Sequence, residues 1–346
     1  MTQGLGLMPL EDCMDTTKTT AEAGDDCKTK NEITKECLTD DVKRGKMNEA
    51  MSVTIAADVY DHSLARVLLH PHRISEGSCP VFSEGENGPA VVVHLVTSEE
   101  RVLDCRAFRD SLREEERVKT VRDIEFIPMR GTGIRPSSFP LSNVCTVRSP
   151  ELNGNAFGLV ERARQRMCVS LATDETRVAL RAIRWVSGKF GRILWSKSMA
   201  TSEAAISNAI EAIGLKNNPV VICSPLNAIG AIDIFDIIGN LKARRRVDPI
   251  VGYKMDDGSV VPVFINETMP DHIFYIVPSG RALGEMSIFV DPTVQTYDKP
   301  ERLIKGWLCF QDQGMIFTGT KLTNVVYLGW KGIIEMMKNL VVRVTS

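Results

Sequence analysis

The chain has 346 residues, of which 43% are hydrophobic and 25% are charged, and its formal net charge at pH 7 is -2. This length suffices for a full hydrophobic core in one large domain or two lobes, and the near-neutral charge argues against a dedicated nucleic-acid binder. The first residues, MTQGLGLMPLEDC, lack the features of a signal peptide, and no run of about 18 apolar residues predicts a membrane span. We therefore expect a globular, soluble protein with no membrane partner.

The first 51 residues are rich in Thr, Asp, Glu and Lys and cannot build a core alone. The simplest interpretation of this segment is a disordered tail. The following residues predict a short strand over Val53–Ala56, then a short helical patch, and a loop over Gly77–Gly88.

A run of apolar residues over Ala90–Val96 predicts a strand, and Ile124–Pro128 predicts a second one. The charged stretch Ser98–Arg122 lies between them, which indicates a projecting hairpin. The Gly, Pro and Ser content of Gly131–Pro150 predicts a loop.

A long helix is expected next, with Asn155 placed to cap its start. One apolar face then continues on both sides of a polar interruption at Thr173-Asp174-Glu175-Thr176. The residues of this face are Phe157, Val160, Met167 and Leu171, followed by Val178, Ala179, Ala182, Ile183 and Val186.

From Thr201 onward, short elements follow one another closely. Ile206, Ala209, Ile210 and Ile213 predict an amphipathic helix that ends at Gly214. Ser224-Pro225 predicts the start of another helix. The predicted strands are Val220–Cys223, the hairpin partners Pro249–Tyr253 and Val260–Ile265 on either side of Asp256-Asp257-Gly258, and then His272–Val277 and Met286–Val290.

The stretch KPERLIKGWLCFQDQGMIFTGTKLTNVVYLG, residues 299–329, carries the most specific pattern. Ile304–Phe317 predicts one long strand of roughly 45 Å at about 3.3 Å per residue. We expect Gly314 at a bend or bulge where a side chain would obstruct. Thr323-Asn324 predicts local side-chain hydrogen bonds, and Val325–Leu328 a short closing strand.

Between about residues 155 and 329 the chain resembles tailed-phage major capsid proteins. The resemblance rests on a Glu-Arg approach at Glu301, the Gly306-Trp307-Leu308 strand, the polar turn before Gly314-Met315, the spine-helix pattern Val160 to Met167, and the order helix, short strand, Ser-Pro, helix after Thr201. It implies the mixed α+β Hong Kong 97 fold, which encapsulin shells share.

This resemblance implies six segments and a function. They are an N-terminal arm (1–51) that becomes ordered on neighbouring subunits, an arm-to-core connection (52–88), an extended loop (89–135), a peripheral domain with the spine helix (136–200), an axial domain (201–298), and a long peripheral strand returning to the core (299–346). The implied function is a major capsid protein that forms pentamers and hexamers in the icosahedral head of a tailed virus, assembled in the host cytoplasm.

The implied partners are copies of the same chain, packaged double-stranded DNA bound non-specifically, a portal, a scaffold and a decoration protein. Two alternatives stay open. An encapsulin-like nanocompartment shell would use the same fold, and a soluble α/β enzyme would carry a site that its sequence pattern does not reveal.

Motifs for catalysis and cofactor binding fail in their spacing, so we expect no enzyme, catalytic residue, cofactor or metal. Gly188-Lys189 lacks the earlier glycine of a phosphate loop, since that position is Ile183, and a dinucleotide fingerprint from Gly131 fails at Pro136. His70 and His72, with Cys79 or His94, form a poor zinc signature and are interpreted as ordinary histidines.

The densest basic cluster is Arg244-Arg245-Arg246. It is interpreted either as a solvated helix end or as a contact with packaged nucleic acid or with a neighbour's carboxylates. The axial placement favours the carboxylates over DNA. Trp307 and Trp330 are expected to be core or interface anchors.

Nine cysteines include none in a CxxC pair. Cys13, Cys27 and Cys37 lie in a segment too polar to bury them. We expect either free exposed thiols or, in an oxidising environment, inter-subunit disulfides of this arm with Cys79, Cys105 or Cys145.

Overall fold

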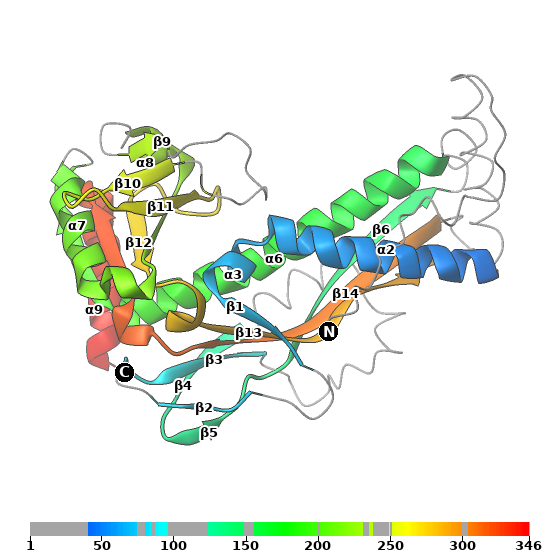
Figure 1. Ribbon diagram of the computed structural model, residues 1–346, viewed down its shortest axis with the longest axis horizontal. Helices are drawn as coiled ribbons and strands as arrows, with labels where there is room; N and C mark the ends of the chain where they lie inside the picture. The colour runs from blue at the N-terminus through cyan, green and yellow to red at the C-terminus, as the bar shows by residue number, and fades with distance from the viewer. Residues whose placement is uncertain are drawn as a thin grey trace.

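The chain forms an elongated mixed α+β structure in this computed structural model, as the sequence predicts (Figure 1). The structure describes residues 41–74, 80–84, 87–95, 124–148, 156–198, 201–230, 235–237, 249, 251–298 and 304–345. Within these ranges, one long sheet and its helices form a body, and a second sheet forms a lobe at one end of it.

The body is built on a six-stranded sheet whose longest strand is central. β14 (Ile304–Phe317) pairs antiparallel with β13 along one edge, and with β6 and then β3 along the other. The remaining strands of this sheet are β1 (His70–Arg73), β3 (Ala90–Leu95), β4 (Ile124–Met129), β6 (Phe139–Arg148) and β13 (Gly284–Thr296).

The predicted bounds of β14 are confirmed, and Gly314 lies where a side chain would obstruct. A Cβ there would be 2.7 Å from the Ser137 carbonyl oxygen and 3.1 Å from the Phe289 ring. The register shifts lie instead in β13, around Val290. The expected bulge at Gly314 is therefore wrong in position, because the partner strand carries the extra residues.

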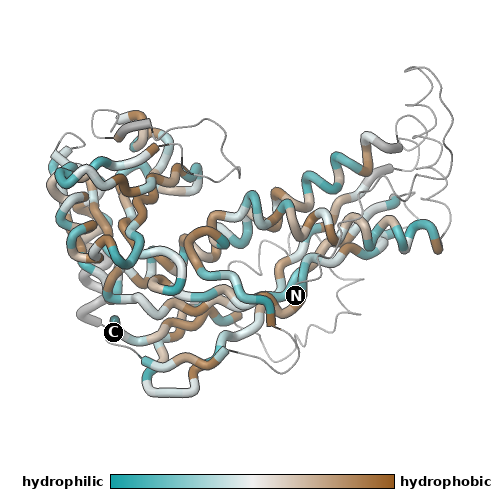
Figure 2. Tube along the Cα trace, viewed as in Figure 1, coloured by the Kyte–Doolittle hydropathy of each residue, from teal (hydrophilic) through white to brown (hydrophobic). Residues whose placement is uncertain are grey.

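Two helices run side by side against the body sheet. α6 (Ala156–Lys189) has 34 residues and is continuous, so its polar segment at Thr173–Thr176 does not break it. Figure 2 shows hydrophobic and hydrophilic residues alternating along α6, as an amphipathic helix requires. α2 (Asp41–His62) packs on α6 and β13, and α3 (Leu64–Leu68) continues it.

α2 corrects two predictions. The strand expected at Val53–Ala56 is wrong, because Met51, Ile55 and Val59 repeat at helical spacing and are fully buried. The last residues of the predicted arm are also part of this helix, since Arg44 and Met47 are buried against their own chain. Residues 1–40 lie outside the described residues.

The lobe is a seven-stranded sheet with three helices. Its strand order is β7-β15-β12-β8-β11-β10-β9. These strands are β7 (Arg192–Ser196), β8 (Val220–Cys223), β9 (Phe235–Ile237), β10 (Val251–Lys254), β11 (Val260–Ile265), β12 (Ile273–Val277) and β15 (Asn324–Leu328), and the helices are α7 (Ser202–Ile213), α8 (Pro225–Gly230) and α9 (Gly329–Thr345).

Most predictions for the lobe are confirmed. The stripe on α7 is buried, Gly214 follows the helix with φ 77°, and β10 and β11 form the expected hairpin. The Ser224 hydroxyl accepts a hydrogen bond from the Asn227 N–H at 3.1 Å, which caps α8. The predicted local side-chain bonds are present, from Thr323 to the Thr320 carbonyl and from Asn324 to the Leu322 carbonyl.

The expected loop over Gly131–Pro150 is wrong, because β6 covers ten of its residues. These residues, Phe139 to Arg148, pair antiparallel with β14. In addition, β5 (Thr132–Ile134) pairs with β2 (Phe82–Ser83). The antiparallel hairpin of β3 and β4 is confirmed, while the charged stretch between them lies outside the described residues.

The six segment boundaries stay predictions. β13, within residues 201–298, pairs in the body sheet.

None of the helices in the described ranges combines the length and apolar content that crossing a membrane would require.

Candidate functional site

Of the six candidate disulfide residues, Cys145 is the one that the structure describes. Cys145 lies on β6 and is 7% exposed, and burial raises the pKa of its thiol while nearby Arg166 opposes that rise. Cys13, Cys27, Cys37, Cys79 and Cys105 lie outside the described residues. Among the described cysteines none forms a disulfide, and Cys168, Cys223 and Cys309 are buried as well.

Inter-subunit disulfides therefore find no support in the described part of the chain. A buried thiol on a paired strand cannot meet a cysteine of another chain unless the strand edge opens. Burial also raises the pKa of Cys223 to about 12, which keeps that thiol protonated and unreactive.

Arg244, Arg245 and Arg246 lie outside the described residues, so their role stays a prediction. The two tryptophans behave differently from each other. Trp307 is fully buried in the body core, whereas Trp330 at the start of α9 is 74% exposed. Trp307 is therefore a core anchor, whereas Trp330 is not part of the core.

The histidines singled out in the sequence lie on two strands that do not pair with each other, His70 and His72 on β1 and His94 on β3. His94 Nδ1 is 2.8 Å from the Ser137 hydroxyl, and His70 lies beside Arg281. In the part of the chain that the structure describes, no group of three or more His, Cys, Asp or Glu side chains is placed to hold a metal ion.

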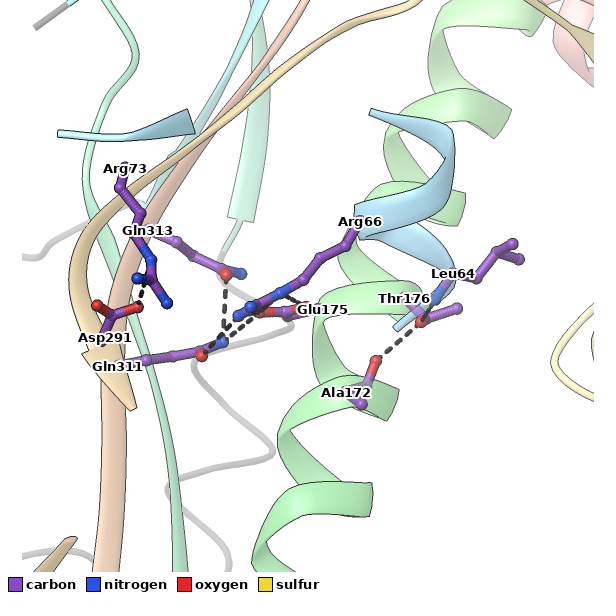
Figure 3. Close-up of polar contacts among 9 residues, drawn as sticks. All are labelled: Leu64, Arg66, Arg73, Ala172, Glu175, Thr176, Asp291, Gln311 and Gln313. Carbon is purple, nitrogen blue, oxygen red and sulfur yellow. Dashed lines mark hydrogen bonds and ion pairs between the residues drawn. The ribbon is translucent and has the colours of Figure 1, made fainter. Parts of the chain in front are cut away.

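A buried polar cluster joins α3, α6 and β14 at the centre of the body (Figure 3). The Arg66 guanidinium donates to both carboxylate oxygens of Glu175, with its Nη2 2.7 Å from Oε1 and its Nε 3.0 Å from Oε2. Gln311 Nε2 donates to the same carboxylate at 2.6 Å and to Gln313 Oε1 at 3.1 Å. These side chains are at most 3% exposed.

The two charges of this cluster stabilise each other. Burial disfavours the guanidinium, but the Glu175 carboxylate outweighs that cost and raises the pKa of Arg66. The Arg66 guanidinium therefore keeps its charge in a dry environment, where a bidentate contact with a carboxylate is strong and geometrically specific. The pair joins α3 to α6, and Gln311 joins both residues to the long strand.

This cluster was not predicted from the sequence, although the sequence contains one sign of it. The polar run at Thr173–Thr176 interrupts an apolar face, and Asp174, Glu175 and Thr176 are all buried. Thr176 Oγ1 accepts from the Leu64 N–H at 3.1 Å and so helps to hold the start of α3. A charged residue at a core position of a helix predicts a buried partner. Local sequence does not reveal that partner, because Arg66 lies 109 positions away from Glu175.

α2 is fastened to β13 by a ladder of polar contacts. Arg44 donates to both carboxylate oxygens of Asp298, at 2.5 and 2.7 Å. Asn48 then donates to Thr296 Oγ1 at 3.1 Å, and Ser52 Oγ accepts from the Val294 N–H at 2.8 Å. Four helical residues advance about 6 Å and two strand residues about 6.6 Å, so each contact meets the next without strain.

One face of α9 is apolar and exposed. Trp330, Ile334 and Met337 are 74%, 44% and 59% exposed and lie at i, i+4 and i+7, so they share one side of the helix. Trp195, 44% exposed, donates from its indole N–H to the Gly329 carbonyl and lies at the same end of the helix. We call these four residues the α9 face.

The opposite side of α9 holds the helix in place. Glu335 contacts Arg184 of α6 and lies 2.6 Å from His272 Nε2, ahead of β12. The helix is thus anchored to both the body and the lobe, while the α9 face points away from these anchors. A second apolar pair, Leu226 and Ile229, is 63% and 69% exposed on α8, at a different part of the lobe (Figure 1).

No protein-family model and no curated protein matches the chain. Among solved structures, a virus-like particle from Pyrococcus furiosus is 14% identical with a TM-score of 0.46, and the alignment covers 80% of this chain and 98% of that one. The capsid of the cyanophage P-SCSP1u is 11% identical with a TM-score of 0.45, covering 77% and 88%.

The encapsulin complex holo-SrpI from Synechococcus elongatus is 9% identical with a TM-score of 0.40, covering 75% of this chain and 85% of that one. All three TM-scores lie below 0.5. What this chain does is therefore inferred from its own residues and contacts.

Proposed function

We propose that this chain is the major capsid protein of a tailed double-stranded DNA virus, and that its activity is self-assembly into an icosahedral shell. The observation that carries the proposal is the exposure of large apolar side chains in clusters on separate surfaces, the α9 face and the pair on α8. Single exposed apolar residues are ordinary, but clusters that include Trp and Met are typical of protein interfaces.

A shell subunit needs several different interfaces, because it meets neighbours on more than one side. α9 and α8 lie at different parts of the lobe, so their exposed apolar residues offer two separate places of contact (Figure 1). This favours a subunit of an extended assembly over a simple two-fold dimer.

The internal contacts also suit a subunit that carries load. The buried pair of Arg66 and Glu175 and the ladder from α2 to β13 cross-link the long elements of the body. Such ties let a long, thin body transmit force between neighbours without bending. A shell then resists internal pressure because many modest contacts act in parallel.

The remaining parts of the proposal follow from the resemblance in sequence. The partners would be further copies of the chain in pentamers and hexamers, packaged DNA, a portal, a scaffold and a decoration protein. The particle would assemble in the host cytoplasm and persist as the virion, and its subunits would perform no catalysis.

Imaging of the expressed full-length chain by negative-stain electron microscopy tests the proposal. Closed shells or capsomers are expected, with or without the neighbouring virion genes. A chain that sediments as a clean monomer under all these conditions contradicts the proposal and revives the soluble enzyme as an alternative.

The encapsulin-like alternative uses the same surfaces and differs in what the shell encloses. Mass spectrometry and nuclease digestion of particles from infected cells distinguish the two. Protected double-stranded DNA supports the capsid, whereas a stoichiometric enzyme cargo without DNA supports the nanocompartment.

A further inference from the structure

The solvent-facing side of α6 is basic. Six side chains of this helix are exposed between residues 158 and 189, and none is acidic. Four of the six are arginines, and the other two are Gln165 and Val169. The arginines are Arg162, Arg166, Arg177 and Arg184, which we call the α6 arginine row.

The row lies on the side of α6 that is turned away from the buried residues of the helix, and of its two main members only Arg166 reaches back to the sheet, at Cys145 of β6. Met167, Leu171 and Val178 face the body core with no exposed area, and helical geometry places Arg162 and Arg166 on the far side of the helix. From Arg162 to Arg184 the helix rises about 33 Å, close to one turn of B-form DNA at about 34–36 Å. The backbone of the row is rigid, because the helix is continuous throughout.

The carboxylates of α6 do not neutralise the whole row. The helix has seven basic and three acidic residues, although the whole chain has a net charge of -2. Glu161 is engaged by Arg164, Glu175 by Arg66 and Asp174 by Arg177. Arg184 contacts Glu335 of α9.

Among the residues that the structure describes, no carboxylate pairs with Arg162 or Arg166, so both keep their charge available there. Arg162 donates to the Gly158 carbonyl of its own helix, and Arg166 reaches the Cys145 thiol. Neither contact is an ion pair. Exposed guanidinium groups on a rigid scaffold suit the bidentate, sequence-independent recognition of phosphate.

We propose that the α6 arginine row is the surface that contacts the phosphate backbone of enclosed double-stranded DNA, with Arg162 and Arg166 as its main contacts. This inference rests on the proposed function and assigns its DNA contact to one helix face. It also reconciles DNA contact with an acidic chain, because binding needs only a local row of cations. The contact is non-specific, since the row would reach phosphates rather than base edges.

The test compares two double variants of the full-length chain. Arg162→Gln with Arg166→Gln removes two charges from the row, and Arg130→Gln with Arg135→Gln removes two exposed charges at the ends of β4 and β5, away from α6. Binding of a mixed-sequence duplex is followed by fluorescence anisotropy between about 50 and 200 mM salt. The protein is kept dilute, and its dispersed state is checked by sedimentation.

Each lost phosphate contact reduces the magnitude of the negative slope of log K against log salt by about 0.9. We expect the row variant to bind several-fold more weakly and to lose about 1.8 from the magnitude of that slope, with the Arg130 and Arg135 variant unchanged. A third variant, Arg162→Lys with Arg166→Lys, keeps the charge and should retain most of the slope. Thermal melting of all variants checks that they fold.

Equal losses in both Gln variants, or none in the row variant, overturn the inference. It is also overturned if the row variant binds DNA normally but assembles poorly, since the row would then contact an acidic protein surface. Electron microscopy of the same proteins separates this result from the proposed function. If shells form but DNA binding does not depend on the row, the proposed capsid function holds and the DNA-contact inference fails. If DNA binds through the row but no shells form, only the DNA-contact inference holds.

Discussion

The body and the lobe are held together by different kinds of interaction. In the lobe, Ile206, Ile210 and Ile213 of α7 pack on the sheet with Val221 and Phe274, and Phe235 makes edge contacts with Tyr253 and Phe274. The body has an apolar core too, but charged pairs between residues more than 100 positions apart fix its long elements. The lobe is therefore stabilised mainly by burial, and the body also by specific polar geometry.

This difference predicts how each region tolerates amino-acid substitutions. Apolar cores accept volume-conserving substitutions and respond gradually to small losses. A buried ion pair responds abruptly, because removing one partner leaves an uncompensated charge in a dry environment. Single substitutions should therefore separate the two regions by the size and location of their effects.

The largest effect is expected from Glu175→Ala, which strands the Arg66 guanidinium in the core. Breaking such a buried pair costs about 3–5 kcal/mol of the free energy of unfolding. Urea denaturation measures the loss, and hydrogen exchange locates it. Exchange should accelerate in α3 and β14 far more than in α7.

Two variants control this experiment. Arg73→Gln removes an exposed ion pair with Asp291, drawn beside the cluster in Figure 3, and should cost less than about 1 kcal/mol. The double change Arg66→Met with Glu175→Leu should recover part of the stability, although Gln311 loses its acceptor on Glu175 and its donor on Arg66 and keeps only its bond to Gln313. A Glu175→Ala loss no larger than that of Arg73→Gln would contradict the distinction between body and lobe.

A smaller effect is expected from Asp298→Asn, which removes the charge at one end of the α2 ladder. Hydrogen bonds to charged groups contribute about 1.5–3 kcal/mol, and solvent screening at this partly exposed carboxylate reduces that to about 1–2 kcal/mol. Amide exchange in the first three turns of α2 should accelerate while α7 is unchanged. Uniform acceleration throughout both regions would argue against a local fastening.

The same contact predicts a pH dependence. Burial alone would raise the pKa of Asp298, but the two hydrogen bonds from Arg44 outweigh it and hold that pKa below its ordinary value. The contribution to stability is therefore complete above the ordinary aspartate pKa of about 4 and is lost as the pH falls further. Exchange in α2, corrected for the intrinsic rate, should rise below pH 4 in the wild type and stay flat in Asp298→Asn.

The smallest effect is expected from Ile210→Val, which removes one buried methyl group in the lobe. Such changes cost about 0.5–1.5 kcal/mol. Exchange should accelerate in α7 and β8 and leave α2 unchanged. Val53→Ala, at a half-exposed position on α2, is the control and should change little.

The same division explains what the sequence could predict. The stripe of Ile206, Ile210 and Ile213 and the bounds of β14 follow from local periodicity, and both were predicted correctly. β6 was missed because its Pro, Ser and Asn residues suggest a loop, while pairing with β14 over ten residues makes it a strand. α2 was missed because its segment is rich in polar residues, although Met51, Ile55 and Val59 repeat at helical spacing and are buried where α2 packs on α6 and β13.

The exposed surfaces and the polar contacts are harder to predict from the sequence than the helices and strands. The α9 face contains Trp330, which the sequence marked as an anchor without saying where, and exposure depends on how the helix packs. The partner of Glu175 is not local in sequence, and neither is that of Asp298. Local patterns therefore predict elements and apolar cores, whereas long-range polar pairs and exposed faces require the three-dimensional arrangement.

The exposed apolar faces, in the proposed function, are interfaces between copies of the chain. Sedimentation velocity of the wild type beside a variant with Trp330→Ser, Met337→Ser and Leu226→Ser tests this claim directly, with matched melting temperatures as the control. We predict large particles or capsomers for the wild type and a folded monomer or small oligomer for the variant. A wild-type monomer, or a variant that assembles as well as the wild type, would contradict it.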